Sequence, residues 1–177
     1  MERKVVSSYI EILEDLLLAF RLQVFTKRAK RATSIHPKFY LFDVGVFRSL
    51  RPSGPLDQPS EIEGSALEGL VAQHLRAWIA YSRGSHELYF WRTRSGVEVD
   101  FVLYGTEGIW AIEVKNTERL RSEDMRALRA FRDDYPESHA LLIYRGTERL
   151  LRGGILCLPC EDFLKSLVPD KLPERSH

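Results

Sequence analysis

The chain has 177 residues, of which 44% are hydrophobic and 29% charged, and its formal net charge at pH 7 is +1. This composition predicts one globular domain, or one domain with a small accessory subdomain, with enough residues for a sizeable core. It excludes a strongly basic protein, and no apolar run approaches the roughly 20 residues of a membrane span. The N-terminus lacks the pattern of a secretory signal, so we expect a cytoplasmic protein without a membrane segment.

Residues 1–58 are predicted to form an N-terminal helical and basic subdomain. Ser7 or Ser8 can cap a helix whose apolar residues follow helical spacing from Tyr9 to Phe20. A short apolar run at 22–25, a basic segment at 27–38 and an apolar strand at 39–46 follow. This order suits a winged-helix-like element, although one helix is too little to establish it. The breaker-rich loop at 51–59 predicts the subdomain boundary.

Residues 59–168 are predicted to form an α/β core, and residues 169–177 a charged, frayed tail. The helices and strands of the core are expected in the order helix, three strands, helix, two strands, helix. The expected ranges are 61 or 66 to 81, 88–93, 97–103, 109–115, 122–135, 140–144, 155–158 and 161–167.

The basic segment 27–38 is the predicted nucleic-acid contact, because clustered Lys and Arg supply affinity for phosphates independent of base sequence. No acidic residue lies between Asp15 and Asp43. The candidate residues in this segment are Lys27, Arg28, Lys30, Arg31 and Lys38. Its alternative role is a solvated loop or a docking surface for another domain. Arg92 and Arg94 could also hold a phosphate, or be ordinary surface charges.

The segment 96–115, GVEVDFVLYGTEGIWAIEVK, predicts a β-hairpin that turns at Thr106 and Glu107. This register places Asp100 opposite Glu113, and Glu98 opposite Lys115, on one face. The other face is expected to be core, formed by Val97, Val99, Phe101 and Leu103 with Trp110, Ile112 and Val114. Two opposed carboxylates beside an ammonium group suit a divalent cation and metal-assisted hydrolysis. The alternative is a solvated strand face on which Lys115 neutralises Glu98.

These residues resemble the PD-(D/E)XK nuclease superfamily, which has a restriction-endonuclease-like fold. The resemblance rests on Asp100, on the segment Glu113-Val114-Lys115 and on a preceding helix with Glu68. More specifically, the ordered segments resemble the uncharacterised C-terminal domain of predicted prokaryotic AAA-type ATPases. They are Gly64-Ser65-Ala66-Leu67-Glu68-Gly69-Leu70-Val71, Trp91-Arg92, Gly96-Val97-Glu98-Val99-Asp100-Phe101 and Ile112-Glu113-Val114-Lys115. The upstream segment Lys38-Phe39-Tyr40-Leu41-Phe42-Asp43-Val44-Gly45 fits that domain as well.

The resemblance implies a fold in which a mixed sheet is flanked by helices, and a metal-dependent nuclease. Asp100 and Glu113 would bind Mg²⁺ or Mn²⁺, Lys115 would act at the reacting phosphate, and Glu68 would reach the same metal. The implied partners are DNA and an ATPase module. No G-x-x-x-x-G-K-[ST] loop occurs here, so we expect no ATP hydrolysis by that route, and expect a fragment or a stand-alone relative.

Three alternatives concern these residues, the domain as a whole and the two cysteines. Ser65 and Glu68, or Ser60 and Glu63, can form a helix capping box, in which case Glu68 would only satisfy backbone groups. Nuclease-like folds also serve as inactive DNA- or protein-binding modules, since function lies in sites rather than folds. Cys157 and Cys160 form a lone C-x-x-C, which could be a redox pair or half a zinc site but is more typical of buried cysteines.

Overall fold

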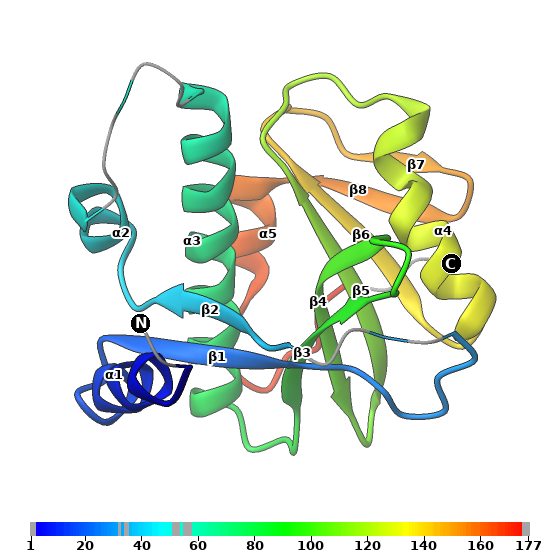
Figure 1. The fold of residues 1–177 in the computed structure, drawn as a ribbon. Coiled ribbons are helices and arrows are strands. Elements are labelled where there is room, and N and C mark those ends of the chain that lie inside the picture. The colour runs from blue at the N-terminus through cyan, green and yellow to red at the C-terminus, as the bar shows by residue number, and fades with distance from the viewer. Residues whose placement is uncertain (1–2, 32, 34–35, 51–53, 55–57, 175–177) are drawn as a thin grey trace.

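The structure is a computed structural model that describes residues 3–31, 33, 36–50, 54 and 58–174. Its core is a mixed sheet of eight strands in the order β2-β1-β3-β4-β5-β6-β8-β7 (Figure 1). The strands are β1 (Ala19–Val24), β2 (Lys38–Leu41), β3 (Glu87–Arg92), β4 (Glu98–Gly105), β5 (Gly108–Lys115), β6 (His139–Tyr144), β7 (Leu150–Arg152) and β8 (Ile155–Pro159). The helices are α1 (Arg3–Asp15), α2 (Val44–Leu50), α3 (Pro59–Tyr81), the short 3₁₀ helix η1 (Ser122–Met125), α4 (Arg126–Asp134) and α5 (Cys160–Ser166).

Helices cover both faces of the sheet, and each face has its own apolar core (Figure 1). On one face α3 contributes Val71, Leu75 and Trp78, which follow helical spacing, and α5 adds Phe163. On the other face α4 contributes Leu128 and Phe131. The predicted α/β class, a mixed sheet flanked by helices, is confirmed.

The strands β1 and β2 extend the same sheet as the rest of the chain, because β1 pairs in parallel with β3. The division of the chain at residue 58 stays a prediction, and most of the expected boundary loop lies outside the described residues. At the other end, the carbonyls of Val168 and Lys171 accept hydrogen bonds from the Trp78 indole N–H. The Trp110 indole donates to the Glu174 carbonyl. The chain therefore stays packed on the core as far as residue 174.

Several predicted element bounds are wrong in the first 58 residues. The helix expected to reach Phe20 ends at Asp15, and the chain then turns through Leu17, whose φ is +59°. Phe20 lies in β1, where its ring stacks on Tyr40 with centroids 5.4 Å apart. The strand expected at 39–46 ends at Leu41. The Asp43 carboxylate then accepts the Val46 N–H at 2.9 Å, which caps the start of α2.

The β4–β5 hairpin has the predicted turn, since Gly105 pairs with Gly108 around Thr106 and Glu107. The predicted register is confirmed from there to Phe101 and Ile112, where the recorded pairing ends. The predicted core face is wrong in part: Val99 packs on the α4 side of the sheet, whereas Phe101 and Leu103 pack on the α3 side. The pairing of β4 with β3 shifts register next to this point, between Tyr89 and Trp91, and so breaks the simple alternation.

Candidate functional site

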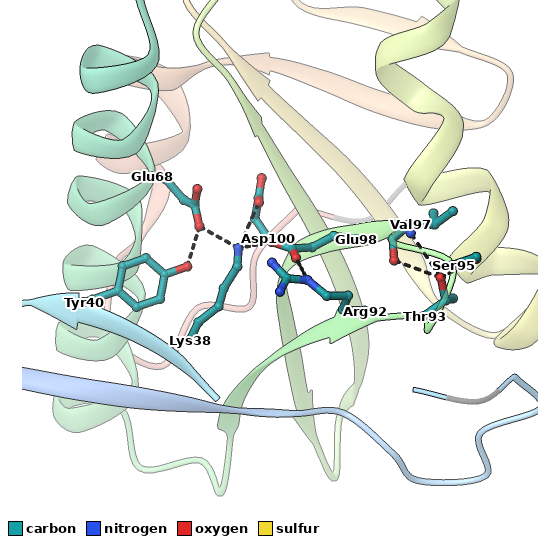
Figure 2. A network of polar contacts seen from close by, with 9 residues as sticks. All are labelled: Lys38, Tyr40, Glu68, Arg92, Thr93, Ser95, Val97, Glu98 and Asp100. Atoms are coloured by element: carbon teal, nitrogen blue, oxygen red, sulfur yellow. Dashed lines mark hydrogen bonds and ion pairs between the residues drawn. The ribbon is translucent and has the colours of Figure 1, made fainter. Parts of the chain in front are cut away.

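A lysine and three carboxylates meet where β2, β4 and α3 approach one another (Figure 2). The Lys38 Nζ atom lies 2.8 Å from Glu68 Oε1 and 3.3 Å from Asp100 Oδ1, and it also contacts Glu98. Only 15% of the Lys38 side chain is exposed. Burial lowers the pKa of Lys38, but the charges of Asp100, Glu68 and Glu98 outweigh it, so the pKa is raised and the ammonium form is kept. We call Lys38, Glu68, Glu98, Asp100, Glu113 and Lys115 the charged cluster.

Asp100 lies where the ladder between β4 and β5 ends. Its Oδ2 atom accepts the Val114 backbone N–H at 2.9 Å, so this carboxylate takes the place of a strand partner. Burial first, and then the charge of Glu68, raise the pKa of Asp100 to about 6, although Lys38 and the Val114 N–H act in the opposite direction. The strand ends therefore hold a desolvated carboxylate whose charge is only partly compensated.

Glu113 and Lys115 form an ion pair on β5, with Lys115 Nζ 2.6 Å from Glu113 Oε1. Glu113 is 4% exposed, and its Oε2 atom has no hydrogen-bond partner within the described chain. Burial first, and then the charge of Asp100, raise the pKa of Glu113 to about 8. The alternative in which Lys115 neutralises Glu98 is wrong, since Glu98 contacts Lys38 and Arg92 instead.

Glu68 lies well inside α3, which begins at Pro59, so neither predicted capping box marks the helix start. Its Oε1 atom accepts hydrogen bonds from Lys38 and from the Tyr40 hydroxyl (Figure 2). Burial and then Glu68 raise the pKa of Tyr40, so the hydroxyl stays a donor. Glu68 therefore belongs to the charged cluster rather than to the end of its helix.

The chemistry of the charged cluster fits a divalent cation, but one of the three predicted ligands, Glu68, has another partner. Asp100 and Glu113 supply oxygen donors, and Mg²⁺ commonly takes one or two carboxylates and several waters. The unpartnered Glu113 Oε2 atom and the raised pKa values of both acids indicate a deficit of positive charge. Within the described residues, however, no three His, Cys, Asp or Glu side chains converge as a metal-binding group. The third predicted ligand, Glu68, is bound to Lys38 in this arrangement.

The residues predicted to bind nucleic acid do not form one patch. Lys30 donates to the Asp133 carbonyl at 3.3 Å, and the Arg31 Nε atom lies 3.1 Å from Asp134 Oδ1, at the end of α4. The ammonium group of Lys27 lies 4.0 Å from the Tyr104 ring centroid, at the far end of β4 from Asp100.

Among the remaining basic candidates, Lys38 is a member of the charged cluster and Arg92 pairs with Glu98. Arg28 and Arg94 are exposed. The role of these residues in binding DNA stays a prediction.

The two cysteines are not paired with each other. Cys157 is buried at the centre of β8, and Cys160 begins α5. Burial raises the pKa of both thiols, which disfavours the thiolate that redox chemistry requires. The redox interpretation therefore has no support from the structure.

Sequence reasoning missed the role of Lys38 and Tyr40 in the charged cluster. Both residues lie on an edge strand more than fifty positions before Asp100 in the chain, so no local spacing connects them. It also missed a cleft of about 490 Å³ between β2, α2 and α3. The cleft is lined by apolar side chains such as Phe39, Leu41 and Phe47, and it reaches Lys38 and Glu68 of the charged cluster.

Comparisons with known proteins give relatives without an assigned function. A family described as a domain of unknown function, DUF4143, matches residues 63–163, and a second one, DUF8612, matches residues 1–57. The chain is 24% identical over 170 residues to the uncharacterized proteins Mb2031c of Mycobacterium bovis and Rv2008c of Mycobacterium tuberculosis. The match covers 93% of this chain but only 36% of each relative. No solved structure matches the chain significantly. Within the described residues, no helix is long and apolar enough to span a membrane.

Proposed function

The chain belongs to the DUF4143 family of domains of unknown function, and on that premise we propose that it is a metal-dependent DNA phosphodiesterase with a restriction-endonuclease-like core. The observation that carries the proposal is the juxtaposition of Asp100, Glu113 and Lys115 at the ends of β4 and β5. One buried carboxylate, Glu113, and one mostly buried carboxylate, Asp100, both with raised pKa values, lie near an ammonium group there. Strongly perturbed acids next to a charged partner are typical of functional sites.

Asp100 and Glu113 would hold the Mg²⁺ or Mn²⁺ ion. When bound, the ion would lower the pKa of a coordinated water and neutralise charge on the phosphate. The backbone N–H of Val114 fixes the Asp100 carboxylate at 2.9 Å, so this group is positioned before any ligand arrives. Such preorganisation is what electrostatic catalysis requires.

Lys115 is the residue of this site that can reach a substrate. One third of its side chain is exposed, whereas Glu113 beside it is almost fully buried. Burial lowers the pKa of Lys115, but Glu113 outweighs this effect and raises it, so the ammonium form persists. We assign Lys115 to the stabilisation of negative charge on the phosphate at the mouth of the site.

An associated ATPase module is part of the proposal. The chain spans about a third of the length of the curated relatives it matches, so those proteins have room for a further module. The segments that resemble the C-terminal domain of AAA-type ATPases support this view. Cleavage by the isolated chain is the simplest test of the site itself.

A non-catalytic DNA- or protein-binding module is the second candidate, and one observation favours it. The single positive charge of Lys38 already compensates part of the negative charge of Glu68, Glu98 and Asp100. The charged cluster can therefore be a structural network rather than a metal site. Under this alternative the carboxylates would matter for folding, and binding would depend on other surfaces.

The test is the cleavage of labelled linear, supercoiled and branched DNA in Mg²⁺ and in Mn²⁺. Wild type is compared with Lys115→Met, which keeps the aliphatic stem, and with the control Lys165→Met, which removes an exposed lysine paired with Glu161. Metal-dependent cleavage that Lys115→Met abolishes and Lys165→Met retains supports the nuclease. Cleavage that survives in Lys115→Met, or its absence from every protein under all conditions, contradicts nuclease activity of this chain at the charged cluster.

A further inference from the structure

Lys38 occupies the position in the charged cluster where a shared cation would lie. Three carboxylates from α3 and β4 converge on its single Nζ atom. Two neighbouring cations, Arg92 and Lys115, each form an ion pair with one carboxylate. A cation shared by several acids is the arrangement expected for a bound metal ion, so Lys38 supplies from within the chain the charge that the acids need.

A divalent cation that binds Asp100 must take the oxygen that Lys38 contacts, because the Val114 N–H already occupies Oδ2. Glu113 differs, since Lys115 contacts only its Oε1 atom and leaves Oε2 without a partner within the described chain. The Lys38 Nζ atom lies 3.3 Å from Asp100 Oδ1, and Asp100 is one of the two proposed metal ligands. A metal ion on the same carboxylate would lie within a few ångströms of the ammonium group in a mostly buried site. Repulsion between like charges is strong at that distance and that burial.

The Lys38 side chain borders a cleft into which it can move when a metal ion binds its carboxylate partners. Lys38 begins β2, the edge strand of the sheet, and its long side chain borders the cleft of about 490 Å³ between β2, α2 and α3. Lysine is a flexible point charge that carries its own hydration well. The cleft also has polar lining residues, among them Asp43 and Ser65, so the ammonium group can move toward them while the strand keeps its pairing with β1.

We propose that Lys38 competes with the divalent cation for Asp100 and Glu68, and thereby keeps the site closed until metal displaces the lysine. This inference rests on the proposed function, because it concerns the same metal site. Lys38 is a positioning residue in this account, rather than a group that touches the substrate. It also explains why Glu68, a predicted ligand, is engaged by Lys38 and Tyr40 in the structure.

The experiment is a titration of the full chain with Mn²⁺ and with Mg²⁺. Metal binding is measured by calorimetry and, separately, by the shift of the thermal unfolding midpoint. Lys38→Met removes the competing charge and keeps most of the stem, so it should bind metal about tenfold more tightly than wild type, within the usual range of coupling between two binding events. Lys38→Arg keeps the charge and should bind no more tightly than wild type. Asp100→Asn added to Lys38→Met should abolish the gain.

A second comparison covers the case in which Lys38→Met does not fold. The pair Lys38→Gln/Glu98→Gln and Glu98→Gln differs only at Lys38, and the double variant removes one positive and one negative charge together. The double variant should bind Mn²⁺ more tightly than Glu98→Gln alone.

The outcomes separate this inference from the proposed function. If Lys38→Met and the double variant bind metal no more tightly than their controls, while Asp100→Asn abolishes binding, the metal site stands and the competition is refuted. If no protein binds Mn²⁺ or Mg²⁺, the metal site and the competition are both refuted. Tighter binding that depends on Asp100 supports both.

Discussion

Glu113 makes the stability of this chain depend on pH in a direction that Glu113→Gln can reveal. Its pKa is raised from an ordinary value of 4.5 to about 8 in the folded chain, mainly by burial and then by Asp100. Between these two values the folded chain holds the proton, whereas the unfolded chain has released it. The free energy of unfolding therefore falls as the pH rises. The stabilisation that protonated Glu113 gives is fully present below the pKa of the unfolded chain and is lost as the pH rises through the pKa of the folded chain.

The size of the pKa shift of Glu113 sets how much unfolding free energy wild type loses as the pH rises. One pKa unit corresponds to about 1.4 kcal/mol, so wild type should lose about 1.4 kcal/mol per pH unit relative to Glu113→Gln between roughly pH 5.5 and 7.5. The loss should level off above about pH 8, at roughly 3–5 kcal/mol in all. Glutamine keeps the shape of the protonated acid and does not titrate.

The assay is urea denaturation of metal-free protein, in the presence of a chelator, at a series of pH values. Glu123→Gln is the matched control, because it neutralises a carboxylate on η1 whose side chain is 70% exposed. Its stability should run parallel to that of wild type at every pH. If the stability of Glu113→Gln also runs parallel to wild type from pH 5.5 to 9, then the Glu113 carboxyl group is not desolvated, and the electrostatic argument for the site is refuted.

Three further substitutions test the fold around the charged cluster by urea denaturation. Gly69→Ala should stabilise the chain by about 0.5–1 kcal/mol, because Gly69 lies inside α3 and a Cβ there meets no atom within 4 Å; a loss of stability would contradict this packing. Leu75→Ala should cost about 3 kcal/mol, since Leu75 is fully buried between α3 and the sheet, and a change below about 1 kcal/mol would refute its place in the core. Arg31→Gln should cost about 1–3 kcal/mol, because it leaves the buried Asp134 carboxylate without its 3.1 Å partner; an unchanged midpoint would assign Arg31 to the surface.

The elements from α3 onward were largely predictable because their patterns are local. The apolar residues of α3 recur at helical spacing, and the turn at Thr106 and Glu107 lies between two strongly β-forming runs. The same local signals failed where long-range contacts decide. Phe20 fits the helical spacing before it, but it lies in β1 because its ring stacks on Tyr40 of β2. The strand β7 has three residues and was not predicted.

The candidate site was predictable only in the part that one hairpin brings together. Asp100 lies directly beyond the last pair of the β4–β5 ladder and accepts the Val114 N–H, so the hairpin that the turn sets brings it close to Glu113 and Lys115. Lys38 reaches the same place because β1 pairs with both β2 and β3, a topology that no spacing in the sequence encodes. For the same reason the sequence suggested phosphate binding for Lys38, whereas the structure places its ammonium group among three carboxylates.

The most direct test of the central claim is a crystal structure of the chain grown with Mn²⁺, with anomalous scattering measured to locate the ion. We expect a manganese peak bound by carboxylate oxygens of Asp100 and Glu113, with the Lys38 ammonium group moved away from Asp100. Crystals at saturating Mn²⁺ with no manganese at these two residues, and with Lys38 still in contact with Asp100, would contradict that claim.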